Sequence, residues 1–176
     1  ENLGMLHKAE STMRRKREEL KNSRRKEMIG FRRIDPEVAM EKNTWFHLGR
    51  NSCEEILYCL RRIADPCEEH VDNNFVPLSK EQVKEYIPLR DTVLFLLRRT
   101  GKILQTDSYG EVDDVRREAE ELKDCLEKAR DAQMQRMQSS KENIAVAYLY
   151  LNLLQETREL TSSLRHLLRA SKGFRE

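Results

Sequence analysis

The sequence has few of the residues that interrupt helices and few of those that favour β-sheets. Its 176 residues include six Gly and four Pro, and aromatic residues make up only 6%. No run of alternating polar and apolar residues predicts a strand. Charged residues, in contrast, account for 36% of the chain. This composition excludes a β-sandwich or a doubly wound sheet, and it favours long amphipathic helices in one domain with a core of its own.

Long apolar runs and a secretory signal are absent as well. No segment approaches the ~20 apolar residues that span a bilayer, and no signal peptide is visible. The four Cys form no Cys-x-x-Cys pair, which predicts reduced thiols and a cytosolic environment. The net charge is only +2, so we expect no nucleic-acid partner.

Common catalytic motifs are also missing. The chain has no Gly-x-Ser-x-Gly turn, no phosphate-binding Gly-rich loop and no His-Glu-x-x-His pair. It also lacks Glu-x-x-His, the element that di-iron bundles repeat. We therefore expect a protein that is not an enzyme and has no catalytic, cofactor or metal site.

Apolar periodicity and capping signals predict five helices joined by short connections. Asp35 before Pro36 is a typical helix start, and Ser79 with Gln82 forms a capping box. The segment Ser139-Ser-Lys-Glu142 predicts the cap of the last helix. The predicted helices cover residues 3–33, 36–72, 80–105, 112–137 and 140–171. Such a pattern is typical of an all-α antiparallel bundle.

The apolar stripes of these helices indicate which side chains are buried. Small and apolar residues recur from Trp45 to Cys67 at three- and four-residue steps, so Trp45 is expected in the core. Pro66 either kinks this helix or restarts it. On the last helix, one of Tyr148 and Tyr150 is expected to be buried and the other peripheral. Apolar positions of the third helix include Val83, Ile87, Val93, Leu94, Leu97, Ile103 and Leu104.

The segment CLRRIADPCEEHVDNN, residues 59–74, combines thiols, an imidazole and carboxylates. In a continuous helix, Cys59, Cys67 and His70 lie near one face and could bind a soft divalent ion together with Asp65. Ligands from other helices would be Cys125 or His166. The alternative, which we favour, is that the thiols pack in the core while the acidic residues and His70 mark a solvated helix end.

The first predicted helix is strongly basic. Residues 1–33 contain eleven Lys or Arg against five Glu, a local net charge of +6. Its few apolar positions leave it polar nearly all round, which is typical of a solvated helix or of one that contacts an anionic surface.

Two separate segments resemble one known family. NTWFHLGRNSCEEILYCLRRIADPCEEHVDNNF, residues 43–75, and VAYLYLNLLQETRELTSSLRHLLRASKGF, residues 146–174, resemble the cytoplasmic PhoU-like domain at the C-terminus of bacterial sodium/phosphate cotransporters. The resemblance implies a PhoU-like helical bundle over residues 35–176. It also implies a basic membrane-proximal helix over residues 1–34.

Each half of a PhoU-like fold carries a Glu-x-x-x-Asp motif whose carboxylates hold metal clusters, and this chain departs from both copies. In Leu60-Arg-Arg-Ile-Ala-Asp65 the aspartate is kept but Arg61 replaces the glutamate; in the second copy Glu159 is kept but Ser163 replaces the aspartate. Arg61 lies four residues before Asp65, so its guanidinium should neutralise that carboxylate. We therefore expect that the family's metal binding is not retained.

The resemblance implies a regulatory domain of a sodium-dependent phosphate transporter, located on the cytoplasmic face of the inner membrane as part of an integral membrane protein. Its partners would be the transporter's membrane domain and, as a homodimer, a second copy. Basic residues after a membrane span follow the positive-inside bias and attract anionic lipid. The expected inner-leaflet contacts are Arg14, Arg15, Lys16, Arg17, Arg24, Arg25 and Lys26. Alternatives are a free-standing adaptor that binds a partner helix in a groove, and a metal-binding PhoU-type regulator.

Overall fold

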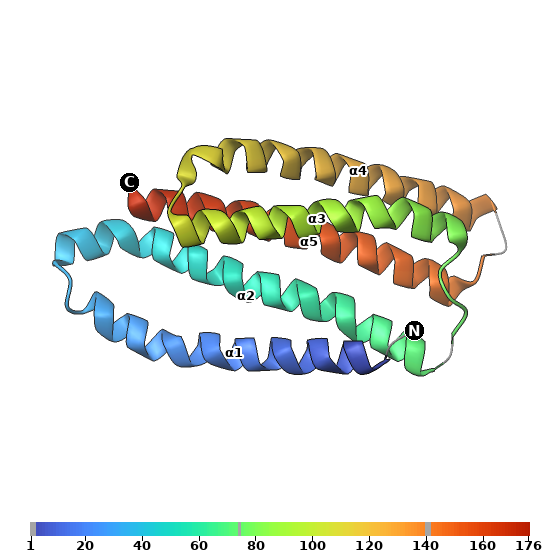
Figure 1. Cartoon of the computed structure of the whole chain (residues 1–176), viewed down its shortest axis with the longest axis horizontal. Helices are drawn as coiled ribbons and strands as arrows, with labels where there is room; N and C mark the ends of the chain where they lie inside the picture. Colours follow the sequence, from blue (N-terminus) through green and yellow to red (C-terminus); the bar gives the residue numbers. More distant parts are fainter. Residues whose placement is uncertain (1–2, 74, 140–141) are drawn as a thin grey trace.

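The protein is a bundle of five α-helices (Figure 1). The computed structural model describes residues 3–73, 75–139 and 142–176, apart from the side chains of Arg25 and Phe31. All regular structure in these ranges is helical, which confirms the all-α prediction. The elements are α1 (Leu3–Phe31), α2 (Pro36–Asp72), α3 (Lys80–Thr106), the 3₁₀ turn η1 (Tyr109–Glu111), α4 (Val112–Ser139) and α5 (Ile144–Arg175).

Local capping signals set the starts of α2 and α3. Asp35 caps α2 by accepting a hydrogen bond from the Glu37 amide at 2.9 Å. Ser79 accepts from the Gln82 amide at 3.1 Å, and the Gln82 side chain accepts from the Ser79 amide at 2.9 Å. These reciprocal bonds satisfy amides that the first helical turn leaves without partners. Pro66 lies inside a continuous α2, so the helix does not restart there.

The start of α5 differs from the sequence prediction. Asn143 caps this helix by accepting hydrogen bonds from the Ala145 amide at 3.0 Å and the Val146 amide at 3.3 Å. Ser139 is instead the last residue of α4, and its hydroxyl donates to the Gln135 carbonyl at 2.9 Å. The prediction that Ser139 caps α5 is therefore wrong. A Ser hydroxyl that bonds back into its own helix is not available as the cap of the next one.

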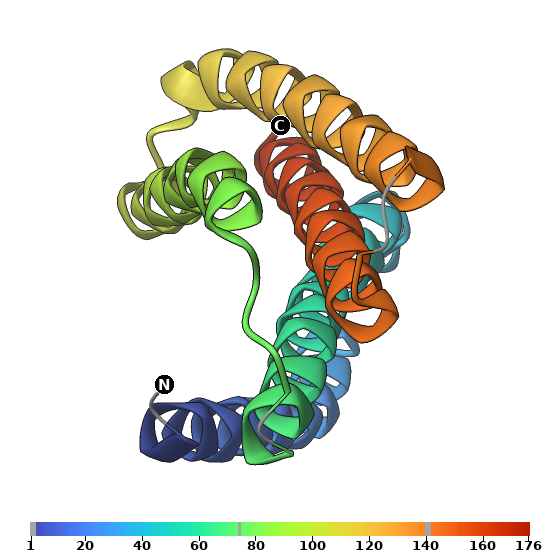
Figure 2. The same cartoon turned by 90° about the vertical axis from the view of Figure 1, so that its right-hand side faces the viewer.

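α5 is the central helix of the bundle. It packs against α2, α3 and α4, whereas α1 packs along α2. Viewed from one end, the helices form an open arc, with α3 and α1 on the two arms (Figure 2). The largest fully buried apolar side chains come from α3, α4 and α5: Leu96, Val112, Val115, Leu126, Tyr150, Leu154, Leu160 and Leu168. The core therefore lies on the α5 side of the arc.

The aromatic residues of α2 and α5 lie at different depths. Tyr150 is fully buried and donates a hydrogen bond to Glu85 at 3.1 Å, whereas Tyr148 is 62% exposed; the expectation for this pair is confirmed. Trp45 is only half-buried, so the prediction that it fills the core is wrong. Its ring packs against Gly173 of α5, where an added Cβ would lie 2.6 Å from Trp45 Cδ2. Trp45 thus packs at the end of the contact between α2 and α5.

Candidate interaction site: the basic helix and the open side of the bundle

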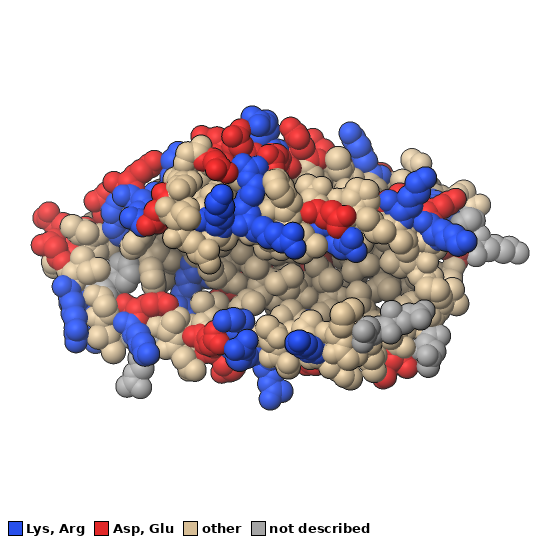
Figure 3. All heavy atoms as spheres, in the orientation of Figure 1, with Lys and Arg blue, Asp and Glu red and all other residues tan. Residues whose placement is uncertain are grey.

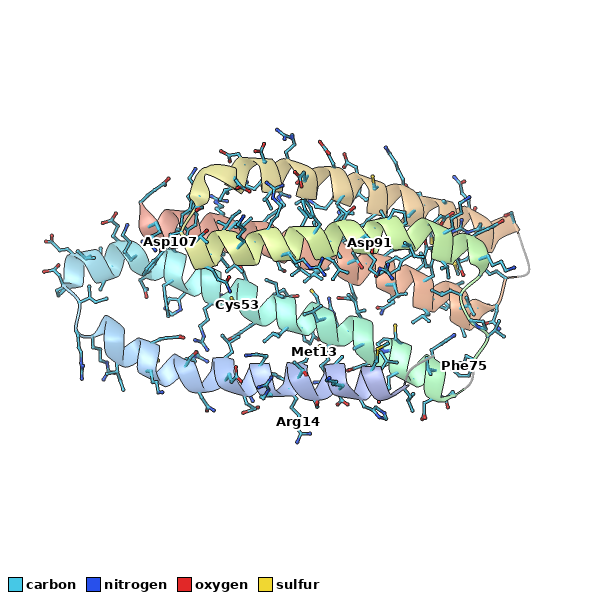
Figure 4. The ribbon with its side chains drawn as sticks, in the orientation of Figure 1. Met13, Arg14, Cys53, Phe75, Asp91 and Asp107 are labelled. Carbon is cyan, nitrogen blue, oxygen red and sulfur yellow. The ribbon has the colours of Figure 1, made fainter. Side chains whose placement is uncertain are left out.

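α1 is held to the bundle by a thin apolar seam and one arginine. Its half-buried apolar side chains are Leu3, Leu6, Met13 and Leu20, and Figure 4 shows Met13 pointing from α1 toward α2. Arg50 of α2 pairs with Glu27 of α1 and donates to the Leu20 carbonyl at 2.6 Å. The Arg50 side chain is only 7% exposed. The donors of a guanidinium group form a rigid fork, so a buried Arg50 with several partners fixes the position of α1 relative to α2.

Arg50 also faces a third group on its own helix. Its Nε lies 3.3 Å from Glu54 without hydrogen-bond geometry. Since the Glu54 side chain is 52% exposed, water shares in this contact and weakens it. The bonds to α1 are therefore the ones that matter for docking.

The predicted membrane-facing cations do not lie on one face of α1. Arg15 and Lys16 both face Glu19, at 3.9 Å and 2.7 Å, and the hydrogen bond from Lys16 lowers the pKa of Glu19. Lys26 is exposed, and the Arg25 side chain lies outside the described residues. Because successive residues of a helix are 100° apart, the consecutive residues Arg14 to Arg17 point around α1 and not along one face.

Arg14, Arg17 and Arg24 form the coherent part of this set. They line a groove of about 820 Å³ between α1 and α2, and no carboxylate in the described ranges lies within ion-pair distance of them. Lys21 lies in the same groove but pairs with Glu18 at 3.1 Å. The α1 side of the groove also carries Glu10 and Glu18, and Glu54 and Glu55 lie on its α2 side. Cations outnumber carboxylates on the α1 side, where three guanidinium groups are available to an anionic surface or ligand.

The proposed metal ligands are not brought together. Cys59 is fully buried, and its burial, followed by the charge of Glu55, raises the pKa of the thiol to about 12. His70 is only 8% exposed, and its Nε2 contacts the Val76 carbonyl at 2.7 Å, so the expectation that it marks a solvated helix end is wrong. Burial raises the pKa of Cys67. Within the described part of the chain, no three His, Cys, Asp or Glu side chains are grouped closely enough to hold a metal ion. A thiol that stays protonated is a poor ligand and a poor nucleophile.

The positions that correspond to the PhoU-like carboxylate motifs do not form a pair of free carboxylates. Arg61 Nε donates to Asp65 at 2.9 Å, as the four-residue spacing predicts. Glu159 accepts a hydrogen bond from Gln155 at 2.7 Å. Ser163 is buried, with 4% exposure, and offers only a neutral oxygen.

Two buried polar contacts escaped prediction from the sequence. Glu156 of α5 is only 5% exposed and pairs with Arg62 of α2 at 2.6 Å, while Asn152 donates to the Arg62 carbonyl at 3.0 Å. Just before the start of α5, Glu142 accepts from Gln82 and Gln133, both at 2.7 Å. A Glu at a core position of the most apolar helix was the available signal for the first contact. The first contact joins α2 to α5, and the second joins α3 and α4 to the segment before α5. Both stabilise the relative positions of these helices.

The open side of the arc exposes an apolar stripe on α3. Val83, Ile87 and Leu94 recur along one face of the helix and are 40%, 40% and 41% exposed. Neither α1 nor α2 packs along α3. Figure 3 shows a hollow on this side that contains few charged side chains.

Half-buried side chains line the inner part of the same hollow. Ile56 and Leu60 of α2, together with Tyr86 and Leu97 of α3, pack against the core while remaining partly accessible. We call this surface, with Val83, Ile87 and Leu94, the apolar trough. Large apolar hollows on soluble domains are characteristic of interaction sites.

One end of the open side holds a smaller pocket. It has a volume of about 300 Å³ and lies between the start of α2, the end of α5 and η1; its apolar lining includes Leu20, Phe46, Cys53, Tyr109 and Phe174. A pocket of this size accommodates a bulky apolar side chain.

None of the described helices has the length and apolar content needed to cross a bilayer. Comparisons of the chain with protein-family models, with curated proteins and with solved structures find no match.

Proposed function

We propose that this chain is the cytoplasmic regulatory domain of a sodium-dependent phosphate transporter, with a PhoU-like fold. The observation that carries the proposal is the resemblance of residues 43–75 and 146–174 to such domains. These segments belong to α2 and α5, the most extensively packed pair of helices in the bundle. The domain would contact the membrane portion and modulate transport, while the ion and phosphate sites would lie in that portion.

The basic groove suits this placement. At an anionic membrane surface each basic residue contributes about 1 kcal/mol, so Arg14, Arg17 and Arg24 together contribute about 3 kcal/mol at low ionic strength. That corresponds to roughly a hundredfold difference in membrane partitioning. The three guanidinium groups would orient α1 on the inner leaflet.

Vesicle flotation tests this orientation. Vesicles of phosphatidylcholine with phosphatidylglycerol should bind the domain at low salt, and pure phosphatidylcholine vesicles should not. Replacing Arg14, Arg17 and Arg24 by Gln should abolish most binding. A matched control replaces Arg15, Lys16 and Lys21, which face carboxylates, and should bind better than the first variant. Equal losses in both variants, or no binding by the parent, would eliminate the orientation.

The gene itself tests the attachment. Several apolar segments of ~20 residues encoded in frame upstream of Glu1 would support a transporter. In cells, deletion of the domain from that transporter should alter sodium-dependent phosphate uptake. An upstream sequence without such segments would contradict the proposal.

A free-standing adaptor is the second candidate, and the apolar trough is the observation that favours it. An adaptor that binds a partner helix needs an exposed apolar groove. It predicts a complete gene without membrane spans, so the same upstream sequence distinguishes the two functions.

A further inference from the structure

We infer that the apolar trough binds one amphipathic helix of a partner protein, with mainly apolar side chains on the inserted face and carboxylates along the flank that meets α3. This inference deepens the adaptor function proposed above, which rests on the same surface, and is compatible with the transporter function. It does not involve the basic groove, which lies between α1 and α2.

The shape of the trough indicates a helix. Its exposed stripe runs from Val83 to Leu94, which corresponds to about three helical turns. The walls are formed by α3 and α2, and its inner surface by half-buried Leu60 and Leu97. One further helix laid along this channel would contact both walls and close the arc seen in Figure 2. Ridges-into-grooves packing of this kind is how helices ordinarily cover such a surface.

Apolar side chains predominate in the trough. Burial is the sole cause that raises the pKa of Cys67 on the α2 wall. The exposed large apolar side chains on this face of α3 are Val83, Ile87 and Leu94. The one cation at the same helical spacing, Arg90, is paired with Asp91 at 2.7 Å. Because a charged side chain loses its hydration when it is buried against apolar neighbours, the inserted face of the occupant must be mainly apolar.

The α3 edge of the trough, in contrast, is basic. Helical spacing places Lys80, Lys84, Arg98 and Lys102 beside the exposed stripe of α3. Asp91 is the acidic residue along the α3 edge, and it is already paired with Arg90 at 2.7 Å.

These edge cations are available to a partner. In the described ranges, no carboxylate lies within ion-pair distance of any of these four cations. This row of unpaired cations beside an apolar channel matches a helix whose adjoining flank carries Asp or Glu. It disfavours a helix with basic flanks, because like charges across an interface suppress the wrong partner.

The probe for this inference is a pair of designed helical peptides of about 18 residues. Both carry Leu on one face; one has Glu on its flanks and the other has Lys. Fluorescence anisotropy with the intact chain should show binding of the Glu peptide. The Lys peptide should bind at least about tenfold more weakly, and added salt should reduce the difference between the two.

Matched variants locate the binding site. Ile87→Asp with Leu94→Asp should lower the affinity for the Glu peptide by about tenfold or more. Met134→Asp, at a 48% exposed position on α4, should not. Circular dichroism melts of each variant establish that the bundle remains folded.

Charge reversal tests the flanks. Lys84→Glu with Arg98→Glu should exchange the preference toward the Lys peptide. Arg116→Glu with Arg130→Glu, which makes the same change in net charge on α4, should leave the preference unaltered.

Four outcomes would overturn the inference. The first is that neither peptide binds measurably, and the second is that the Glu peptide binds the Ile87→Asp, Leu94→Asp variant as tightly as the parent. Sedimentation of the chain alone could reveal a dimer that this variant abolishes, in which case a second copy fills the trough. Flotation with anionic vesicles could depend on the same two residues, in which case the trough faces lipid. None of these results would decide the transporter proposal, which the upstream sequence tests.

Discussion

Replacing Arg50 by Met should release α1 from the bundle while leaving the rest of the fold intact. Arg50 is the buried connection between α1 and α2, through Glu27 and the Leu20 carbonyl. Hydrogen bonds to charged groups contribute about 1.5–3 kcal/mol each. Glu27 is 31% exposed and can rehydrate, and Met refills part of the apolar volume. We therefore expect the docking of α1 to weaken by about 2–3 kcal/mol.

Hydrogen–deuterium exchange with mass spectrometry measures this effect directly. A loss of about 2–3 kcal/mol raises the undocked population roughly 30- to 150-fold. A single released helix is only marginally stable in water, so the amides of α1 should exchange faster by about that factor. The amides of α5 should keep their protection, because none of their contacts changes.

The control is Arg61→Met, on the same helix. Arg61 is 54% exposed and pairs with Asp65, so its removal should cost less than about 0.5 kcal/mol. The reasoning would be refuted if Arg50→Met left α1 protection unchanged. It would also be refuted if α1 and α5 lost protection to the same extent.

Three further predictions test separate parts of the structure. Gly101→Ala should raise the free energy of unfolding by about 0.5–1 kcal/mol because its Cβ meets nothing within 4 Å, whereas Gly173→Ala should lower it by about 1–3 kcal/mol through the clash with Trp45; the opposite order in urea titrations would contradict the packing. Cys59, with its pKa of about 12, is thiolate in only about one molecule in ten thousand at pH 8, so iodoacetamide should alkylate exposed Cys125 and spare Cys59, as peptide mass spectrometry would show. The hydrogen bond from Arg136 lowers the pKa of Glu85 below its ordinary 4.5. This carboxylate therefore stabilises the fold above pH 4.5, and the stabilisation is lost as the pH falls through its folded-state pKa. Glu85→Gln should make the free energy of unfolding depend less on pH in this acidic range, and an unchanged pH dependence would exclude a stabilising role for Glu85.

Local signals in the sequence were sufficient to predict most of the helix boundaries. The caps at Asp35 and Ser79 act within three residues, so their hydrogen bonds depend little on the rest of the fold. The same holds for the pair Arg61–Asp65, which is set by helical spacing alone. Ser139 shows the limit of such signals. Both Ser139 and Asn143 are good capping residues, and the choice between them depends on how far α4 continues.

Contacts between distant segments could not be read from the sequence. The periodicity of α3 identifies Val83, Ile87 and Leu94 as apolar positions, but it cannot say whether a neighbouring helix covers them. The buried pair Arg62–Glu156 depends on the register between α2 and α5, which no local pattern specifies. For the same reason the basic residues of α1 were predicted as one surface, although Glu19 neutralises part of the set and α2 borders the rest.

The exposure of Leu94 tests the open arc most directly. Leu94 is 41% exposed and Leu96, on the same helix, is 1% exposed, so the two residues differ in burial but not in intrinsic reactivity. Hydroxyl-radical footprinting of the dilute, monomeric chain should oxidise Leu94 readily and leave Leu96 nearly untouched. Equal protection of the two leucines would mean that another part of the chain covers the trough, and the open arrangement of α3 and α1 would be wrong.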